Sequence, residues 1–204
     1  MHFGMEHDRS KPTKSIASGS APHSVAHSEA SSTLVYPEWL GDASFCETHG
    51  SRFAYVVGEM ARGIASPRMV IAAVEAGLVG FYGSAGLKPA VIADGLSEIE
   101  TELGRNAPAW GANLIHSPQQ PGYEAAVVDL FLARNLTRVS ASAFMALSPE
   151  IVRYAARGLT KGDDGKAVRH NHVFAKVSRA EVARQFMAPP PERMLLDLVA
   201  GGRL

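Results

Sequence analysis

The sequence lacks the features that mark several large classes of protein. Its 204 residues include one cysteine, Cys46, which excludes an internal disulfide and a cysteine-based metal cluster. The 20 basic residues equal the 20 acidic ones, so the charge gives no reason to expect a nucleic-acid partner. No apolar run reaches the roughly 18 residues of a membrane span, and the first residues lack the apolar core of a signal peptide. We therefore expect a cytoplasmic protein with neither nucleic acid nor membrane as partner.

Four common motifs are also missing, namely GxGxxG, GxxxxGK[ST], HExxH and GxSxG, so no nicotinamide, P-loop, zinc-protease or hydrolase assignment is supported. Hydrophobic residues make up 46% of the chain, which is enough for a sizeable core. Residues 1–33 are rich in Ser, His, Ala and Pro without any period, and we interpret them as a disordered tail before a domain over residues 34–204. The spacing of the tail's histidines is too irregular to predict a metal site: His2, His7, His23 and His27.

Residues 53–86 are typical of one complete βαβ unit. Strand 53–57 is nearly all apolar, as expected of a parallel strand that is buried on both faces. A glycine-bracketed loop over residues 58–63 follows it, and Ser66-Pro67 predicts the N-cap and first residue of a helix. Residues 78–86 add a second strand and a second glycine-rich loop. Two such loops at the carboxyl ends of neighbouring parallel strands are where α/β proteins build their sites.

The rest of the chain alternates helical and strand patterns without a hairpin signal, which predicts an α/β protein with a parallel sheet. Helices are expected over residues 88–103, 123–134, 151–157, 178–187 and 192–199, and strands over residues 110–115, 137–142 and 172–177. This spacing fits either a TIM-type (β/α)₈ barrel or a doubly wound sheet. Five strands fall short of a full barrel, which needs about 250 residues.

Three local patterns give more detailed expectations. Trp39 and Leu40, in a short segment before the first strand, are expected to pack on the body of the domain. Residues 161–166 are rich in Gly, Asp and Lys and predict an exposed turn. Ser178 followed by Glu181 has the spacing of a capping box at a helix start.

Polar residues interrupt two of the apolar strands. Asn113 lies inside a strand, where an unpaired amide costs about 1–3 kcal/mol, so it is either a cofactor ligand or a structural amide satisfied by the protein. Ser140 and Ser142 alternate with apolar residues and form either a polar patch in the mouth of the sheet or hydroxyls satisfied by the backbone. His116 ends its strand either as an acid/base group or, as we favour, as a loop-capping histidine.

Charged residues stand near the ends of the first and last strands. Glu59, Met60 and Arg62 suit a planar ligand lying against the loop, and the competing interpretation is a solvated turn with a buried methionine. Lys176 is the strongest single signal, because an ammonium in an apolar strand needs an anion or a strong acceptor beside it. A Schiff-base nucleophile is the competing role for this lysine.

Four segments taken together resemble the PfaD-type proteins of polyunsaturated fatty acid and polyketide synthesis, which belong with the FMN-dependent enoyl reductases and nitronate monooxygenases. They read GEMARGIASPRMVIAAVEAGLVGFYGSAGL, WGANLIHSP, RVSASAFMALSPEIVRYAARGL and HVFAKVSRAEVARQFM. The resemblance covers about residues 36–204. It implies an FMN-binding (β/α)₈ barrel, present here as its N-terminal part, that uses NAD(P)H to reduce enoyl thioesters on an acyl carrier protein.

The same resemblance implies the site residues. The loop of Gly58, Met60 and Ala61 would lie along the isoalloxazine ring, and the full set implied to bind FMN is Gly58, Met60, Ala61, Asn113, Ser140 and Lys176. Glu59 departs from the family pattern, which usually has a small residue there. The family's later Gly-Gly-His segment, with flavin-phosphate contacts and the catalytic histidine, has no counterpart, so we expect an inactive or incomplete reductase. The alternatives are a non-catalytic half-barrel that assembles with a second chain, and a nitronate monooxygenase.

Overall fold

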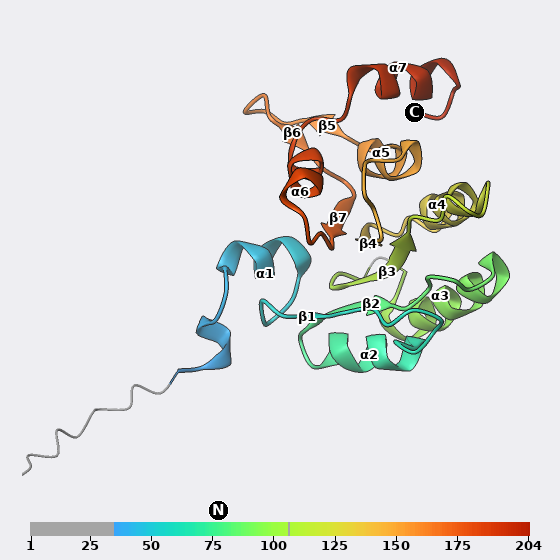
Figure 1. Ribbon diagram of the computed structural model, residues 1–204. Coiled ribbons are helices and arrows are strands. Elements are labelled where there is room, and N and C mark those ends of the chain that lie inside the picture. The colour runs from blue at the N-terminus through green and yellow to red at the C-terminus, as the bar shows by residue number, and fades with distance from the viewer. Residues whose placement is uncertain (1–34, 106) are drawn as a thin grey trace, which may run out of the picture. The chain divides into compact units, whose positions relative to one another are not determined.

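The computed structural model describes residues 35–105 and 107–204, so the predicted tail over residues 1–33 lies outside the described residues (Figure 1). Its main element is a five-stranded sheet in which every neighbouring pair of strands is parallel. The strand order is β1-β2-β3-β4-β7. The strands are β1 (Val56–Val57), β2 (Val79–Tyr82), β3 (Trp110–Ile115), β4 (Arg138–Ser142) and β7 (His172–Ala175).

Helices fill the connections between these strands and follow the last one. They are α2 (Pro67–Glu75), α3 (Pro89–Leu103), α4 (Tyr123–Ala133), α5 (Pro149–Ala156), α6 (Ala180–Met187) and α7 (Glu192–Ala200). Each lies within a few residues of its predicted range. Helices α2 to α5 follow one another around the outside of the sheet (Figure 1). Because the strand order never reverses along the chain, the sheet is a curled half-barrel of TIM type and not a doubly wound sheet.

The Ser-Pro helix starts are confirmed. The Ser66 hydroxyl accepts a hydrogen bond from the backbone N–H of Met69 at 3.3 Å, and the Ser148 hydroxyl accepts one from Ile151 at 3.2 Å. The predicted capping box of α6 is wrong, because the helix starts later and its N-cap is Arg179, which makes no side-chain cap hydrogen bond. Arg179 and Glu181 form an ion pair instead.

The main core lies between the sheet and its helices. Apolar side chains spaced three or four residues apart along α3 and α4 meet the outward-facing side chains of β3 and β4, as the helical period requires. The buried members include Ile92, Leu96, Ile99, Val127, Phe131, Leu114, Val139 and Ala141. A smaller cluster of Val79, Phe81 and Ala109, packed against Phe45 and Phe174, fills the other face of the sheet.

The segment before β1 differs from the prediction. Trp39 and Leu40 do not pack on the domain, since they are 64% and 61% exposed. Residues Pro37–Trp39 form the 3-10 helix η1. A short helix that was not predicted, α1 (Ala43–His49), packs against the sheet instead. Asp42 caps α1 by accepting from the backbone N–H of Ser44 at 2.8 Å. This helix covers the inner face of the sheet through aromatic contacts with Phe174.

One further element corrects the sequence prediction, and another confirms an exposed turn while adding a hairpin around it. The first strand is shorter than residues 53–57 and is not buried on both faces, because β1 pairs only with β2 among the described strands. The predicted turn over residues 161–166 is the tip of a small antiparallel hairpin, β5 (Thr160–Lys161) and β6 (Ala167–Val168). None of the helices in the described part of the chain is long and apolar enough to cross a membrane.

Candidate functional site

The two glycine-rich loops after β1 and β2 are bonded to each other through their backbones. Arg62 N–H donates to the carbonyl of Ala85 at 2.9 Å, and Gly63 N–H donates to that of Gly83 at 2.8 Å. Gly83 N–H in turn donates to the carbonyl of Ala65 at 2.9 Å. Three cross-loop bonds hold the backbone of both loops, so they form a rigid platform at the carboxyl ends of the strands.

Glycine is required at one position of this platform and leaves open space at another. A Cβ added to Gly83 would lie 1.8 Å from the Met60 carbonyl oxygen, so only glycine permits the close approach of the loops. A Cβ added to Gly58 would meet no atom within 4 Å. Met60 itself is 44% exposed, which contradicts the interpretation of a buried methionine in this turn. Ala61 lies beside it and is exposed.

Asn113 lies at the centre of the site, on β3, level with Ser140 of β4. Its Nδ2 donates to the Ser140 carbonyl at 2.8 Å, to Ser142 Oγ at 2.9 Å and to Glu59 Oε1 at 3.4 Å. The backbone carbonyl of Asn113 accepts from Ser84 Oγ at 2.6 Å. The side-chain NH2 group is therefore satisfied by the protein, as expected of a structural amide. Two amide hydrogens face three acceptors, so the long contact to Glu59 is the weakest of the three.

Lys176 lies just beyond the end of β7 rather than within it. Its backbone N–H still donates to the Ala141 carbonyl at 2.9 Å, but the side chain is 55% exposed, so the prediction of a buried strand lysine is wrong. The anion that the sequence argument required is nevertheless present, because Nζ forms an ion pair with Glu59 Oε1. The Glu59 side chain is only 2% exposed.

This ion pair also shows how the sheet is curved. Glu59 follows β1 and Lys176 follows β7, and these strands stand at opposite ends of the strand order. A flat sheet would separate them by four steps between neighbouring strands, at about 4.8 Å for each step. Curling of the sheet brings both charges together above Asn113, so residues from four strand ends share one site.

His116 belongs to the helix layer and not to this site. Its Nδ1 lies 2.8 Å from Glu124 Oε2, and the other Glu124 oxygen is hydrogen-bonded to the Ser148 hydroxyl. The imidazole stacks on Phe144 with ring centroids 5.1 Å apart. The favoured interpretation of a loop-capping histidine fits these contacts, because they connect the end of β3 to the starts of α4 and α5. Glu124 was not singled out from the sequence, and the acidic first turn of α4 was its only signal.

Another polar cluster lies at the opposite, amino ends of the strands. Arg138 Nε donates to His49 Nδ1 at 3.2 Å, and its terminal nitrogens donate to Thr137 Oγ1 and to the Thr48 carbonyl. Burial, and then the charge of Arg138, lower the pKa of His49 to about 4 and also lower that of His172. Both histidines are therefore neutral near pH 7, and the cluster attaches α1 to the sheet.

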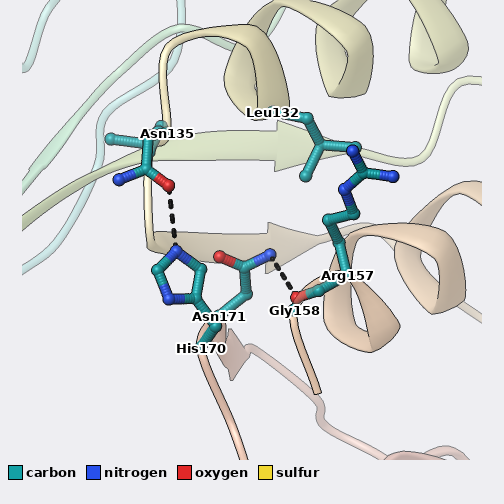
Figure 2. Close-up of a pocket in the computed structure, with 7 residues that line it drawn as sticks. Leu132, Asn135, Arg157, Gly158, His170 and Asn171 are labelled. Atoms are coloured by element: carbon teal, nitrogen blue, oxygen red, sulfur yellow. Dashed lines mark hydrogen bonds between the residues drawn. The ribbon is translucent and has the colours of Figure 1, made fainter. Parts of the chain in front are cut away.

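Two cavities of the described residues also lie at the amino ends. One of about 330 Å³ opens between α4, α5 and the segment before β7, where His170 Nε2 lies 2.9 Å from Asn135 Oδ1 (Figure 2). Asn171 donates from Nδ2 to the Tyr154 carbonyl at 2.7 Å. A second cavity of about 350 Å³ shares Asn135 and His170 with it. Arg157 at the first cavity is the C-cap of α5, where a cation complements the helix dipole, so its presence needs no ligand.

Comparison with known proteins finds similar sequences in polyketide and polyunsaturated fatty acid synthesis. No protein-family model matches the chain. The polyketide biosynthesis protein PksE of Bacillus subtilis is 38% identical over 170 residues, which are 83% of this chain and 22% of PksE. A polyunsaturated fatty acid synthase component of Thraustochytrium is 42% identical over 165 residues, which are 81% of this chain and 11% of that component.

Solved structures agree with this comparison. The enoyl reductase domain of MlnA, from the macrolactin biosynthesis cluster of Bacillus amyloliquefaciens, matches with a TM-score of 0.78 and 35% identity. The match covers 82% of this chain and 38% of that one. FabK from Thermotoga maritima matches with a TM-score of 0.53 at 19% identity, and this likeness concerns the fold alone. The chain thus spans less than half the length of each of these proteins.

Proposed function

We propose that the chain belongs to the PfaD-type enoyl reductases of polyunsaturated fatty acid and polyketide synthesis and that it supplies the ring-binding part of an FMN site. The observation that carries this proposal is the convergence of Glu59, Asn113, Ser142 and Lys176 beside the loop platform. The reaction would be reduction of an enoyl thioester on an acyl carrier protein with NAD(P)H, in the cytoplasm. FMN would carry the hydride from NAD(P)H to the enoyl thioester.

The residues at the carboxyl ends fit the ring of a flavin. An isoalloxazine presents carbonyl oxygens and ring nitrogens along one edge and a flat apolar surface on each face. For that edge Asn113 would offer its side-chain oxygen, since its NH2 group is already bonded within the protein, while Ser142 and Lys176 would offer a hydroxyl and an ammonium. Gly58 leaves open space, and the half-exposed thioether of Met60 stands next to it, as contact with a flat ring requires. Of the other predicted ligands, Ser140 contributes its carbonyl to Asn113 and Ala61 lies in the exposed loop.

Three backbone N–H groups of these loops are not available to the phosphate of FMN. A phosphate site in a glycine-rich loop needs free backbone N–H groups that point at the anion. The N–H groups of Arg62, Gly63 and Gly83 are instead bonded to carbonyls of the facing loop. We infer that the described residues hold the ring and that the phosphate is bound by other residues, either of a longer polypeptide or of a second chain.

A comparison of FMN with riboflavin tests this division. Quenching of flavin fluorescence by the purified chain should give dissociation constants for the two that agree within about threefold, since a phosphate contact of 1.4 kcal/mol would be worth about tenfold. Asn113→Leu should weaken both equally. FMN binding that is tenfold tighter than riboflavin binding would contradict the inference about the phosphate.

A turnover assay tests the reaction itself. The chain alone should bind FMN weakly and should not oxidise NADPH in the presence of crotonyl-pantetheine. Stoichiometric FMN in the purified chain together with NADPH oxidation would show that it is a complete reductase. Oxygen-dependent consumption of a nitronate would instead indicate a nitronate monooxygenase.

A further inference from the structure

Glu59 contacts both Lys176 and Asn113, the ammonium and the amide of the site. Its Oε1 accepts from Lys176 Nζ and, at 3.4 Å, from Asn113 Nδ2. A carboxylate that is 2% exposed requires a compensating charge, because an unpaired buried charge is costly. Lys176 is the cation that supplies it. No other acidic side chain of the described residues forms an ion pair with Lys176.

We propose that Glu59 is a positioning residue that holds Lys176 over the carboxyl ends of the strands and keeps the site electrically neutral, so that it takes an uncharged ring in preference to an anion. This inference rests on the proposed function for the identity of the ring. The contact between Glu59 and Lys176 does not depend on any ligand.

The asymmetry of burial supports this assignment of roles. A lysine side chain that is 55% exposed has several rotamers open to it and loses side-chain entropy when it is held in one. The carboxylate is 2% exposed, so the surrounding atoms restrict it more than they restrict the lysine, and the long contact from Asn113 adds to this. Glu59 is thus the fixed partner and Lys176 the oriented one.

The charge balance determines which ligands the site accepts. An anion that approaches Lys176 must compete with a carboxylate that is already in contact with it, and it is repelled by that same carboxylate. A neutral, oxidised flavin ring does not have to displace the carboxylate from Lys176 and is not repelled by it. A reduced flavin carries a negative charge on its ring when deprotonated, so it competes with the carboxylate for Lys176 and is repelled by it. The site should therefore bind oxidised flavin in preference to the reduced anion.

The reactivity of the lysine amine gives a test that needs no flavin. The chain is treated with limiting acetic anhydride, and acetylation of Lys176 is measured by mass spectrometry relative to the exposed Lys161. Glu59→Gln should raise the relative rate at Lys176 by about two- to fivefold, the range expected when a half-exposed ion pair is lost. Glu47→Gln, which neutralises an exposed glutamate on α1, is the matched control and should leave the rate unchanged.

Equal rates in the parent chain and in Glu59→Gln would overturn the proposal. Should Glu59→Gln fail to fold, as judged by its melting curve, Glu59→Asp takes its place. That variant keeps the negative charge but shortens the side chain, and it should give a rate between those of the parent and a free lysine. If Lys176 of the Glu59→Asp variant were acetylated at the same relative rate as in the parent chain, the proposal would likewise be overturned.

Flavin binding tests the consequence for the ligand. In Glu59→Gln, the ratio of affinities for dithionite-reduced and oxidised riboflavin should rise by about two- to fivefold relative to the parent and Glu47→Gln. An unchanged ratio would overturn the claim about ligand charge. If no variant binds flavin while the lysine rate still responds to Glu59, the proposed function fails and the positioning role stands.

Discussion

Replacing Gly83 by alanine should disrupt the loop platform, and the cost follows from the geometry. The new Cβ would lie 1.8 Å from the Met60 carbonyl oxygen and 2.8 Å from its carbon. The obstacle is backbone, so no side chain can rotate away and one loop must move. Such a movement breaks the bonds that Gly83 makes to Gly63 and Ala65.

The magnitude combines two terms. Forced overpacking typically costs about 1–3 kcal/mol, and each of the two backbone hydrogen bonds is worth about 0.5–1.5 kcal/mol net. Because relaxation that breaks the bonds also relieves the clash, the terms overlap, and we expect a loss of about 2–4 kcal/mol. In a chain of this size each kcal/mol lowers Tm by about 2–4 °C, so Tm should fall by about 4–16 °C.

Urea unfolding followed by circular dichroism, with thermal melting alongside, measures this change. Gly58→Ala is the matched control, because its Cβ meets nothing within 4 Å and its backbone is outside the left-handed region. It should change the free energy of unfolding by less than about 1 kcal/mol. It should nevertheless weaken riboflavin binding, since the methyl group enters the space proposed for the ring. A Gly83→Ala protein with the melting curve of the parent would refute the reasoning about the platform.

Two further predictions concern Asn113 of the sheet and His49 of α1. Asn113→Leu removes the donor that Ser142 and the Ser140 carbonyl share and should lower the free energy of unfolding by about 1–3 kcal/mol in urea titrations, whereas Ser142→Ala should cost less. Stability should fall as pH drops from about 6.5 towards 4, because the unfolded state then binds protons that buried His49, facing Arg138 and His172, does not. In His49→Gln the melting temperature should change less over this interval, and an equal change in both proteins would contradict the role of His49.

The order of helices and strands could be predicted because each main signal is local. Ser66 and Ser148, each followed by proline, fix two helix starts through bonds to residues three positions away. Apolar residues at helical spacing fix the covered face of α3. The short helix α1 was missed because seven residues carry little periodicity, and what stabilises it is contact with Phe174, far along the chain.

The site could be predicted only in part for the same reason. Asn113 and Lys176 were recognisable because a polar group in or next to an apolar strand demands a partner, and each was found to have one. Which partner it would be was not recognisable, because Glu59 reaches Lys176 only through the curvature of a sheet whose end strands are β1 and β7. Curvature comes from the packing of all five strands and is not encoded in any one segment.

The use of backbone groups in the two loops determines what kind of ligand contact this part of the fold can make. A loop rich in glycine can either leave its N–H groups free for an anion or bond them to a neighbouring loop and become rigid, and it cannot do both with the same groups. Here Arg62, Gly63 and Gly83 are all used for rigidity. The carboxyl ends still offer the open space at Gly58, the exposed Met60 side chain and the polar side chains beside them. These contacts select for shape and hydrogen bonding along a ring rather than for negative charge, and the pairing of Lys176 with Glu59 acts in the same direction.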